Sequence, residues 1–247
     1  CIIYQDSNTC NQQSKCIWNA QLSQCVCNSV IPQDVVIIMD SSGSVLADGW
    51  RIEKEFVLNL ISTAIPTSSV IGIVQFATNS WTRYQFIDDQ NRTAILEAVN
   101  ALEYTRGWTY MKEAVQNAIT LFSTQSTNPE RRMVLITDGN PNPISQSPCD
   151  LVPTLDALGV NVMVIGVGVS WSRARIDCLV KRADDIIEVE AFNSDAFQAS
   201  RNLTDEFLCR DISFLLTEMK PVAASQLLHP IPFVEFYNNA KDMDLSL

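Results

Sequence analysis

Short apolar runs alternate with amphipathic stretches along most of the chain after residue 33. Residues 34–39 form the first run, which is rich in β-branched side chains and ends at Asp40. A continuous run of this length is typical of a strand that is buried on both faces of a sheet. We predict six strands, at residues 34–39, 69–77, 81–87, 132–137, 160–167 and 186–189, of which 81–87 is shorter and more polar than the strand before it.

Between these runs, apolar residues recur at the three- and four-residue spacing of helices that pack one face on a core. Residues 50–65 show this spacing, and Pro66 is expected to end the helix. Gly159 is expected to end a later helix, and Ser194 to cap the start of the last one. Helices are predicted at 50–65, 93–102, 111–122, 151–158, 194–208 and, as a short element, around 173–182.

Strands that alternate with helices predict an α/β fold. We expect a doubly wound, mostly parallel, six-stranded Rossmann-like sheet with helices on both faces. Few residues separate the runs at 69–77 and 81–87. These two therefore predict an antiparallel hairpin, which makes one edge strand antiparallel. In such a sheet, ligands bind beyond the carboxyl ends of the strands, where the strand order reverses.

The two ends of the chain do not continue this alternation. The first 30 residues are polar and rich in cysteine, and so small a segment needs disulfides to hold a shape. The last 37 residues contain three prolines and the apolar segment 231–237. The apolar side chains of this segment are expected to be buried against another surface. We therefore divide the chain into a disulfide-rich module (1–30), an α/β domain (31–210) and a C-terminal tail or linker (211–247).

The number and spacing of the cysteines indicate the cellular compartment in which the protein folds. There are eight, five of them lie within the first 27 residues, and no two have the Cys-x-x-Cys spacing of a zinc or redox site. A disulfide framework in a secreted protein is the better interpretation. Cys149 and Cys178 flank one predicted helix and strand and are expected to pair. The cysteines predicted to form disulfides are Cys1, Cys10, Cys16, Cys25, Cys27, Cys149, Cys178 and Cys209.

Two further features fit an extracellular or cell-surface glycoprotein. Asn91 and Asn202 each begin an Asn-x-Thr acceptor sequence for N-glycosylation. The chain begins at Cys1, as a mature form does after a signal peptide has been removed. No apolar run approaches the ~20 residues that a membrane-spanning helix needs.

Charge and histidine content exclude several classes of function. The chain has 28 acidic and 17 basic residues, a formal net charge of −11, and no cluster of Lys and Arg, so we expect no nucleic-acid or anionic-membrane partner. The single histidine, His229, argues against a His-rich zinc site and a Ser-His-Asp device, and we expect no enzyme. The acidic clusters at 53–55, 88–89 and 184–185 are interpreted as solvated surface.

The strongest functional signal follows the first predicted strand. Asp40, Ser42 and Ser44 form an Asp-x-Ser-x-Ser sequence, with Gly43 allowing the turn between the two serines. One carboxylate and two hydroxyls are hard oxygen ligands, which favour Mg²⁺, Mn²⁺ or Ca²⁺ over zinc. A polar loop in which a serine caps the next helix explains the pentapeptide equally well.

Two other predicted loops contribute matching groups. Thr109 follows Gly107 ahead of a helix, and Asp138 follows the fourth strand. If the first and fourth strands are neighbours, Asp40 and Asp138 share one crevice. Two carboxylates so placed repel each other unless a cation or a proton lies between them.

Together these loops resemble those of a von Willebrand factor type A domain, also called the integrin I domain. Residues 40–45, 107–109, 136–139 and 161–168 occur in the order and spacing of that family, within about 70% of the chain. Met111 departs from the family pattern, which often has a second Thr there. The resemblance implies that Cys209 pairs with an N-terminal cysteine, Cys27. It also implies a metal-ion-dependent adhesion site made of Asp40, Ser42, Ser44, Thr109 and Asp138.

The resemblance implies a cell-adhesion or extracellular-matrix protein that binds its partner through Mg²⁺, Ca²⁺ or Mn²⁺. The partner is expected to be an extracellular protein that presents an Asp or Glu to the cation. Trp108 is expected at the rim of the site as an aromatic anchor, although packing explains it about as well. For Trp81, ordinary packing is the preferred interpretation.

A second interpretation is structural. The chain is then a subunit of an extracellular polymer or filament that assembles through the cysteine-rich module and the C-terminal tail. Self-assembly through Asp242 or Asp244, bound at the metal site of another copy, is a sharper version of it. A metal-dependent hydrolase is a third class, which is disfavoured because no histidine lies near the predicted site in the sequence.

Overall fold

The computed structural model describes residues 16–19, 24–27, 32–168 and 171–209 of the 247-residue chain. Several predictions lie outside the described residues or concern side chains that the structure does not describe. They are those for the tail 211–247 with His229, Asp242 and Asp244, for the N-terminal cysteines and Cys209, and for Asn202.

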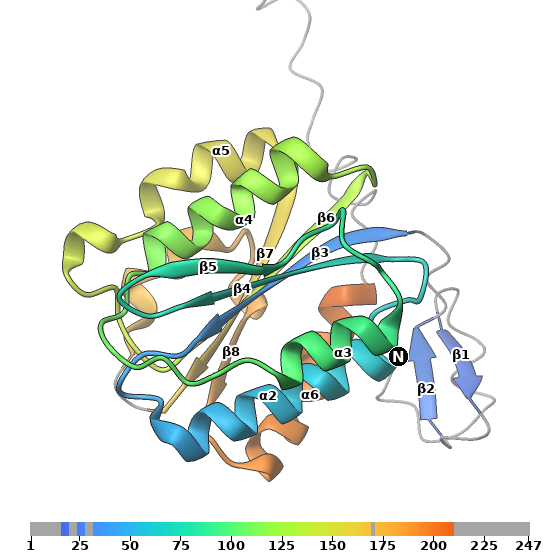
Figure 1. The fold of residues 1–247 in the computed structure, drawn as a ribbon, viewed down its shortest axis with the longest axis horizontal. Coiled ribbons are helices and arrows are strands. Elements are labelled where there is room, and N and C mark those ends of the chain that lie inside the picture. Colours follow the sequence, from blue (N-terminus) through green and yellow to red (C-terminus); the bar gives the residue numbers. More distant parts are fainter. Residues whose placement is uncertain (1–15, 20–23, 28–31, 169–170, 210–247) are drawn as a thin grey trace, which may run out of the picture. The chain divides into compact units, whose positions relative to one another are not determined.

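Six strands form one sheet in the order β5–β4–β3–β6–β7–β8 (Figure 1). The β4–β5 pair is antiparallel and the other four neighbouring pairs are parallel, as the sequence predicts. The strands are β3 (Gln33–Asp40), β4 (Val70–Phe76), β5 (Ser80–Tyr84), β6 (Glu130–Thr137), β7 (Val160–Val167) and β8 (Ile186–Val189).

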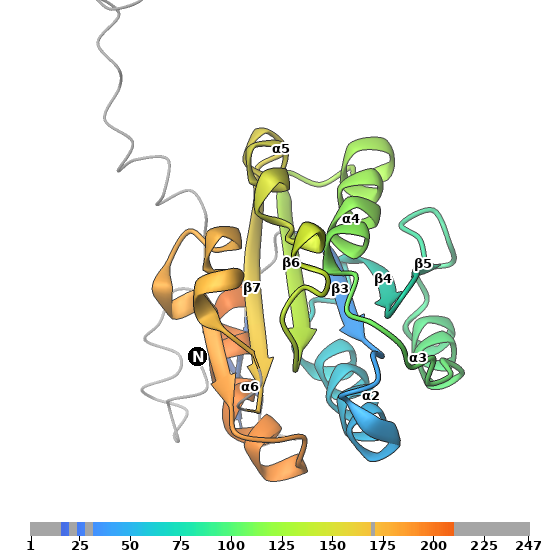
Figure 2. The same cartoon turned by 90° about the vertical axis from the view of Figure 1, so that its left-hand side faces the viewer.

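Helices cover both faces of this sheet (Figures 1 and 2). One layer consists of α2, α3 and α6, and the other of α4 and α5, each with its own hydrophobic core. The fold class predicted from the sequence is therefore confirmed. The helices are α2 (Leu46–Thr63), α3 (Arg92–Asn100), α4 (Met111–Gln125), α5 (Val152–Ala157) and α6 (Ser194–Cys209).

The apolar run of β3 is explained by its central position. Val35, Ile37 and Met39 face the core under α2, whereas Val36 and Ile38 face the core under α4. All five are 0% exposed. Because both faces are buried, the strand needs no polar alternation, and each such side chain contributes about 1.5–3 kcal/mol to folding.

One helix start and one helix cap differ from the prediction. Helix α2 begins at Leu46, one turn earlier than expected, and includes Gly49. A Cβ at Gly49 would lie 2.9 Å from the ring of Phe192, so the glycine permits close packing there. Asn193 caps α6, and not Ser194 as predicted, because the Asn193 Oδ1 accepts a hydrogen bond of 2.7 Å from the backbone N–H of Ala196.

Other boundaries also differ. The short helix expected around 173–182 is absent as an α-helix. In its place are two 3₁₀ turns, Arg173–Arg175 and Asp177–Leu179, and a third, Ala183–Asp185, follows beyond the predicted range. Ile176 and Leu179 are buried and lie three residues apart, a spacing that suits 3₁₀ geometry. Strand β5 ends at Tyr84, three residues before the predicted limit.

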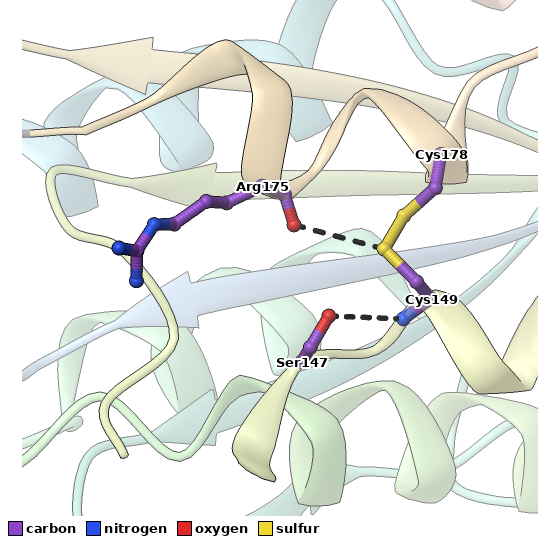
Figure 3. The surroundings of a disulfide bond; sticks show 4 residues. All are labelled: Ser147, Cys149, Arg175 and Cys178. Atoms are coloured by element: carbon purple, nitrogen blue, oxygen red, sulfur yellow. Dashed lines mark hydrogen bonds between the residues drawn. A yellow bond between two sulfur atoms is a disulfide. The ribbon is translucent and has the colours of Figure 1, made fainter. Parts of the chain in front are cut away.

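The predicted disulfide between Cys149 and Cys178 is confirmed (Figure 3). The two Cα atoms are 5.6 Å apart and the bond spans 29 residues. It joins the 3₁₀ turn Cys149–Leu151, which leads into α5, to the turn Asp177–Leu179. A loop of this length is worth about 3.5 kcal/mol in the chain-entropy model.

A separate hairpin lies in the N-terminal region. Strands β1 (Cys16–Asn19) and β2 (Gln24–Cys27) are antiparallel, and their register sets Cys16 opposite Cys27. The sequence predicts a disulfide module there but does not predict its strands. The division of the chain into three segments at residues 30 and 210 stays a prediction.

Candidate metal centre

The sheet order brings the predicted site residues to one edge. Strands β3 and β6 are neighbours, and the strand order reverses between them. Asp40 ends β3, and Asp138 follows the last residue of β6. The arrowheads of β3, β6 and β7 point to this same edge (Figure 2). The condition for a shared crevice is therefore met at the place where α/β sheets bind ligands.

Hydrogen bonds join the two aspartates through the two serines. The backbone N–H of Ser42 donates to the Asp40 Oδ1 at 2.8 Å. The hydroxyls of Ser42 and Ser44 are 3.3 Å apart, and the Ser44 hydroxyl donates to the Asp138 Oδ1 at 2.8 Å. The Asp-x-Ser-x-Ser loop thus reaches across from β3 to the end of β6.

Thr109 adds a third hydroxyl to this group. A Cβ at Gly139 would lie 3.3 Å from the Thr109 Oγ1 and 3.9 Å from the Ser44 Oγ, so both hydroxyls face the same small space beside Gly139. The carbonyl of Thr109 accepts a hydrogen bond of 3.1 Å from the backbone N–H of Asn142. All five residues predicted for the metal site are therefore brought together.

Gly107 lets the Thr109 loop approach the Asp-x-Ser-x-Ser loop. Its φ of 107° is in the left-handed region, and its carbonyl accepts a hydrogen bond of 2.9 Å from the backbone N–H of Gly43. A Cβ at Gly107 would lie 2.3 Å from the Thr78 Oγ1. That same hydroxyl oxygen accepts from the backbone N–H of Trp108 at 2.9 Å. A side chain at position 107 would therefore collide with Thr78 on the turn between β4 and β5 and displace the loop that contacts Gly43.

Other residues that hold these loops were missed by the sequence analysis. The Tyr104 hydroxyl lies 3.0 Å from the carbonyl oxygen of Ser42 and 3.1 Å from that of Gly43, and donates its proton between them. The buried Ser41 hydroxyl donates to the Phe76 carbonyl at 2.9 Å. No local signal marks Tyr104, because its partners lie about 60 residues earlier in the chain.

Asp40 is held by contacts from two further elements. The Thr137 hydroxyl on β6 donates to the Asp40 Oδ2 at 2.6 Å. The backbone N–H of Asp40 donates to the Glu53 Oε1 on α2 at 3.1 Å. Together with the bond from Ser42, these contacts fix both the backbone and the carboxylate of Asp40.

The burial of Glu53 corrects a prediction. Residues 53–55 were interpreted as solvated surface, but Glu53 is 0% exposed on the core side of α2. Residues 49, 50, 53, 56, 57 and 60 share the buried side of the helix, and this spacing is the signal that identifies it. Asp185 is likewise buried, whereas Glu55, Asp88, Asp89 and Asp184 are exposed as expected.

Burial raises the pKa values of the acidic side chains at the site. Desolvation, with the nearby charge of Asp138, raises the pKa of Asp40 to about 7. Burial also raises the pKa of Asp138, and burial together with Asp40 raises that of Glu53. A bound cation would relieve the desolvation and repulsion that oppose ionisation of these carboxyls.

The donor set fits a hard divalent cation. Asp40 and Asp138 offer carboxylates, and the remaining three residues offer hydroxyls. In the described part of the chain, no group of three or more His, Cys, Asp or Glu side chains is placed to hold a metal ion by itself. Neutral hydroxyls or water would therefore have to complete the coordination, which suits Mg²⁺ or Ca²⁺ better than zinc.

Two exposed apolar side chains lie near the site residues in the sequence. Trp108, predicted as a rim residue, is 57% exposed, and Leu46 at the start of α2 is 65% exposed. Arg106 lies on the Thr109 loop with its guanidinium 5.6 Å from the centre of the Tyr104 ring. Leu46 and Arg106 have φ values of 61° and 62°, a strained conformation for side chains of this size. Neither residue was predicted.

The remaining predicted surface residues are placed as follows. Trp81 is half-buried, and the Arg83 guanidinium stacks 4.8 Å from its ring. Asn91 is exposed and caps α3, its Oδ1 accepting from the backbone N–H of Thr93 at 2.9 Å. Because the cap uses the oxygen, the amide nitrogen to which a glycan attaches is left for modification.

A comparison with known proteins identifies a matching family. The model of the von Willebrand factor type A domain matches residues 34–206. Human integrin alpha-X is 26% identical over 172 residues, which cover 66% of this chain and 15% of the integrin. Cochlin from Cavia porcellus is 26% identical over 186 residues, covering 72% of this chain and 32% of cochlin. The chain thus spans less than a third of these relatives.

Solved structures share the fold. Proximal thread matrix protein 1 from the mussel byssus superposes with a TM-score of 0.66 and 19% identity, covering 72% of this chain and 48% of that protein. The same mussel protein is also known with zinc in its MIDAS motif, the metal-ion-dependent adhesion site. A von Willebrand factor type A protein from Catenulispora acidiphila gives a TM-score of 0.58 and 22% identity, covering 74% and 44% of the two chains.

Proposed function

The chain belongs to the von Willebrand factor type A family, and we propose that it is an extracellular adhesion or matrix protein that binds a partner's Asp or Glu through a divalent cation. The observation that carries the proposal is the hydrogen-bonded group of Asp40, Ser42, Ser44 and Asp138, with Thr109 beside it. Integrin, collagen and cochlin chains among the relatives support the adhesion and matrix class.

The charges of the site suit an acidic ligand. Asp40 and Asp138 would hold the cation with two negative charges, while Ser42, Ser44 and Thr109 would add neutral oxygens. Bound Mg²⁺, Ca²⁺ or Mn²⁺ would supply an electrophilic centre that accepts one more carboxylate oxygen. Because the protein groups only balance the cation, the incoming Asp or Glu meets no net negative charge at the crevice.

The rim supports a protein partner over a small ion. Trp108 and Leu46 expose apolar surface and are close to Thr109 and Ser44 in the sequence, and aromatic anchors contribute strongly to protein interfaces. Arg106 adds a positive charge on the same loop as Trp108. A peptide whose acidic residue stands next to a bulky apolar one fits this combination.

An extracellular location is supported by three observations. The Cys149–Cys178 disulfide suits an oxidising compartment. Asn91 is exposed within its glycosylation sequence. Relatives include integrin and collagen chains. Among the described helices, none has the length and apolar character needed to cross a membrane.

The test compares cation-dependent capture by two matched variants. The wild-type chain, Asp138→Asn and Asp184→Asn are immobilised and exposed to extracellular-matrix proteins with Mg²⁺ or with EDTA. Asp184 has a side chain 82% exposed and serves as the control. We expect EDTA and Asp138→Asn to abolish binding and Asp184→Asn to retain it. Binding that survives EDTA and Asp138→Asn contradicts the proposal.

A second candidate function is a structural subunit of an extracellular polymer, and the collagen chains among the relatives favour it. In that case the chain self-associates, and the cation is secondary. Light scattering of the chain with and without EDTA, and with Asp40→Ala, separates the two. Assembly that is indifferent to both changes supports the polymer. Removal of residues 238–247 tests whether the C-terminal acids contribute.

A further inference from the structure

Glu53 is a buried acid without an obvious structural reason. It lies on the core side of α2, between Trp50 and Phe56, and is 0% exposed. Its Oε1 accepts the backbone N–H of Asp40 at 3.1 Å. Its Oε2 has no hydrogen-bond partner among the described residues.

A carboxyl group is costly at this position. The buried neighbours on the same side of the helix, Trp50, Phe56, Val57 and Leu60, are apolar and pack into the core. An apolar side chain would join that core without loss, whereas a buried carboxyl must give up its hydration. One oxygen of Glu53 recovers a single hydrogen bond and the other recovers none. Core packing therefore does not explain why an acid stands here.

The bond to Asp40 lies where β3 leaves the sheet. The β3–β6 register ends at Met39 opposite Ile136, whereas the β3–β4 register continues to Asp40 opposite Phe76. The strand thus separates from β6 at the residue that carries the predicted metal-binding carboxylate. Glu53 accepts the Asp40 N–H at this point.

Two contacts of Asp40 act on its side chain, whereas the pairing of β3 with β4 and the bond to Glu53 act on its backbone. Ser42 donates to the Oδ1 and Thr137 to the Oδ2, and these two bonds orient the carboxylate. They do so only if the Cα of Asp40 is itself held in place. The bond to Glu53 is the contact from α2 that does this, and it ties the strand end to the helix that follows the metal-binding loop.

We propose that Glu53 is a positioning residue of the cation site: by accepting the backbone N–H of Asp40 it fixes the strand end and so sets the Asp40 carboxylate in the geometry that binds the cation. This inference rests on the proposed metal site. Hydrogen bonds that orient metal ligands typically change metal affinity by about 10- to 100-fold when they are removed.

The experiment exchanges the acceptor while keeping the length of the side chain. Glu53→Gln keeps an oxygen that can accept the Asp40 N–H, whereas Glu53→Met has similar length and flexibility but only a weak acceptor. Glu55→Met is the matched control, because Glu55 lies two residues away with a side chain 54% exposed. Mg²⁺ is titrated into each 247-residue chain by calorimetry, and the melting temperature is measured without metal.

We expect Glu53→Gln and Glu55→Met to bind Mg²⁺ within about threefold of wild type, and Glu53→Met to bind about tenfold more weakly. Rescue by Gln distinguishes positioning from charge, because Gln restores the acceptor and not the negative charge. A purely structural role would instead change the melting temperature of Glu53→Met and leave its Mg²⁺ affinity unchanged.

Several outcomes overturn the inference. One is a Mg²⁺ affinity of Glu53→Met that equals that of the wild type. Another is a Mg²⁺ affinity that falls equally in Glu53→Gln and Glu53→Met. If Glu53→Met does not fold, Glu53→Leu is the second apolar variant; failure of both to fold while Gln folds assigns Glu53 to folding and not to the site. A wild-type chain that does not bind Mg²⁺ removes the proposed function itself, which is a separate result.

Discussion

At the scale of the residue, Asp40 joins four parts of the molecule. Its carboxylate accepts from Ser42 in its own loop and from Thr137 on β6, and its backbone donates to Glu53 on α2. The Asp138 carboxylate is linked to it through the two serines. Hydrogen bonds offset part of the cost of burying these polar groups, although the Glu53 Oε2 has no partner among the described residues. Burial leaves the Asp40 carboxyl sensitive to protons and cations.

The pH dependence of metal binding follows from Asp40. Its pKa of about 7 means that the metal-free site is partly protonated at neutral pH, and a cation must displace that proton. We expect the apparent Mg²⁺ affinity to fall up to about tenfold per pH unit below 7. Calorimetric titrations at pH 8, 7 and 6 measure it, and an affinity that is flat across this range contradicts the assignment.

The same shift affects stability without metal. Since the folded state raises the pKa of Asp40 from 3.8 to about 7, it binds the proton more tightly than the unfolded state does. The free energy of unfolding of the metal-free chain should therefore fall as the pH rises from about 4 to 7, by up to about 4 kcal/mol from this group. Urea denaturation with EDTA measures the loss, and saturating Mg²⁺ should reverse it above pH 7.

Gly107 should be more sensitive to substitution than another glycine with positive φ. At Gly107 a Cβ would lie 2.3 Å from the Thr78 hydroxyl, whereas at Gly159 no atom lies within 4 Å. Gly107→Ala should therefore cost about 2–3 kcal/mol of stability and weaken Mg²⁺ binding, while Gly159→Ala should cost about 1 kcal/mol. Denaturation curves and Mg²⁺ titrations of both variants test this. Equal losses would show that the loop tolerates a side chain.

At the scale of the element, α6 is fastened to α2 by a buried polar cluster. The Arg201 Nε contacts the Asp205 Oδ1 at 2.5 Å within α6, and both side chains are about nine-tenths buried. The same guanidinium donates to Asn59 and Thr63 on α2. Burial raises the pKa of Asp205, although Arg201 opposes the shift. The position of α6 thus depends on one arginine as well as on apolar packing.

Removal of that arginine should be costly. Arg201→Met leaves Asp205 buried without its cation, and breaking a buried pair in this way costs about 3–5 kcal/mol. The exposed pair between Arg51 and Glu55 on α2 is the control, and Arg51→Met should cost less than about 1 kcal/mol. Denaturation of both variants at one pH provides the comparison. A small loss at Arg201 would mean that packing alone holds α6.

At the scale of the whole molecule, charge and site act in opposite directions. The chain carries a formal net charge of −11, and of its 28 acidic residues two are predicted metal ligands. The general field therefore repels an acidic partner, while one bound cation would attract it locally. Specific binding then depends on the cation more strongly than it would in a basic protein.

Salt should therefore speed association. For an acidic peptide binding the Mg²⁺-loaded chain, the association rate should rise between about 10 and 150 mM NaCl, because salt screens the long-range repulsion. The dependence on Mg²⁺ should persist at both concentrations. Surface plasmon resonance measures the rates, and an association rate that falls with salt would point to a basic binding surface instead.

The sequence by itself determined the class of fold and the chemistry of the candidate site. Apolar runs and helical spacing are local patterns, so they predict strands, helices and a parallel sheet without knowledge of contacts. Residue types indicate hard oxygen groups at Asp40, Ser42 and Ser44, and the resemblance to the type A domain implies a metal site that also includes Thr109 and Asp138. The Cys149–Cys178 pair was also predicted, since both cysteines flank the same helix and strand.

The tertiary structure decided which of these groups meet. Strand order is not encoded in any local pattern, and only the pairing of β3 with β6 places Asp40 beside Asp138. The same holds for Tyr104, whose hydroxyl reaches carbonyls about 60 residues away. For Glu53, helical spacing marks the buried side of α2, but only the packing of α2 on the sheet sets this acid against the backbone of Asp40. Such contacts depend on packing between distant elements, which residue spacing alone does not specify.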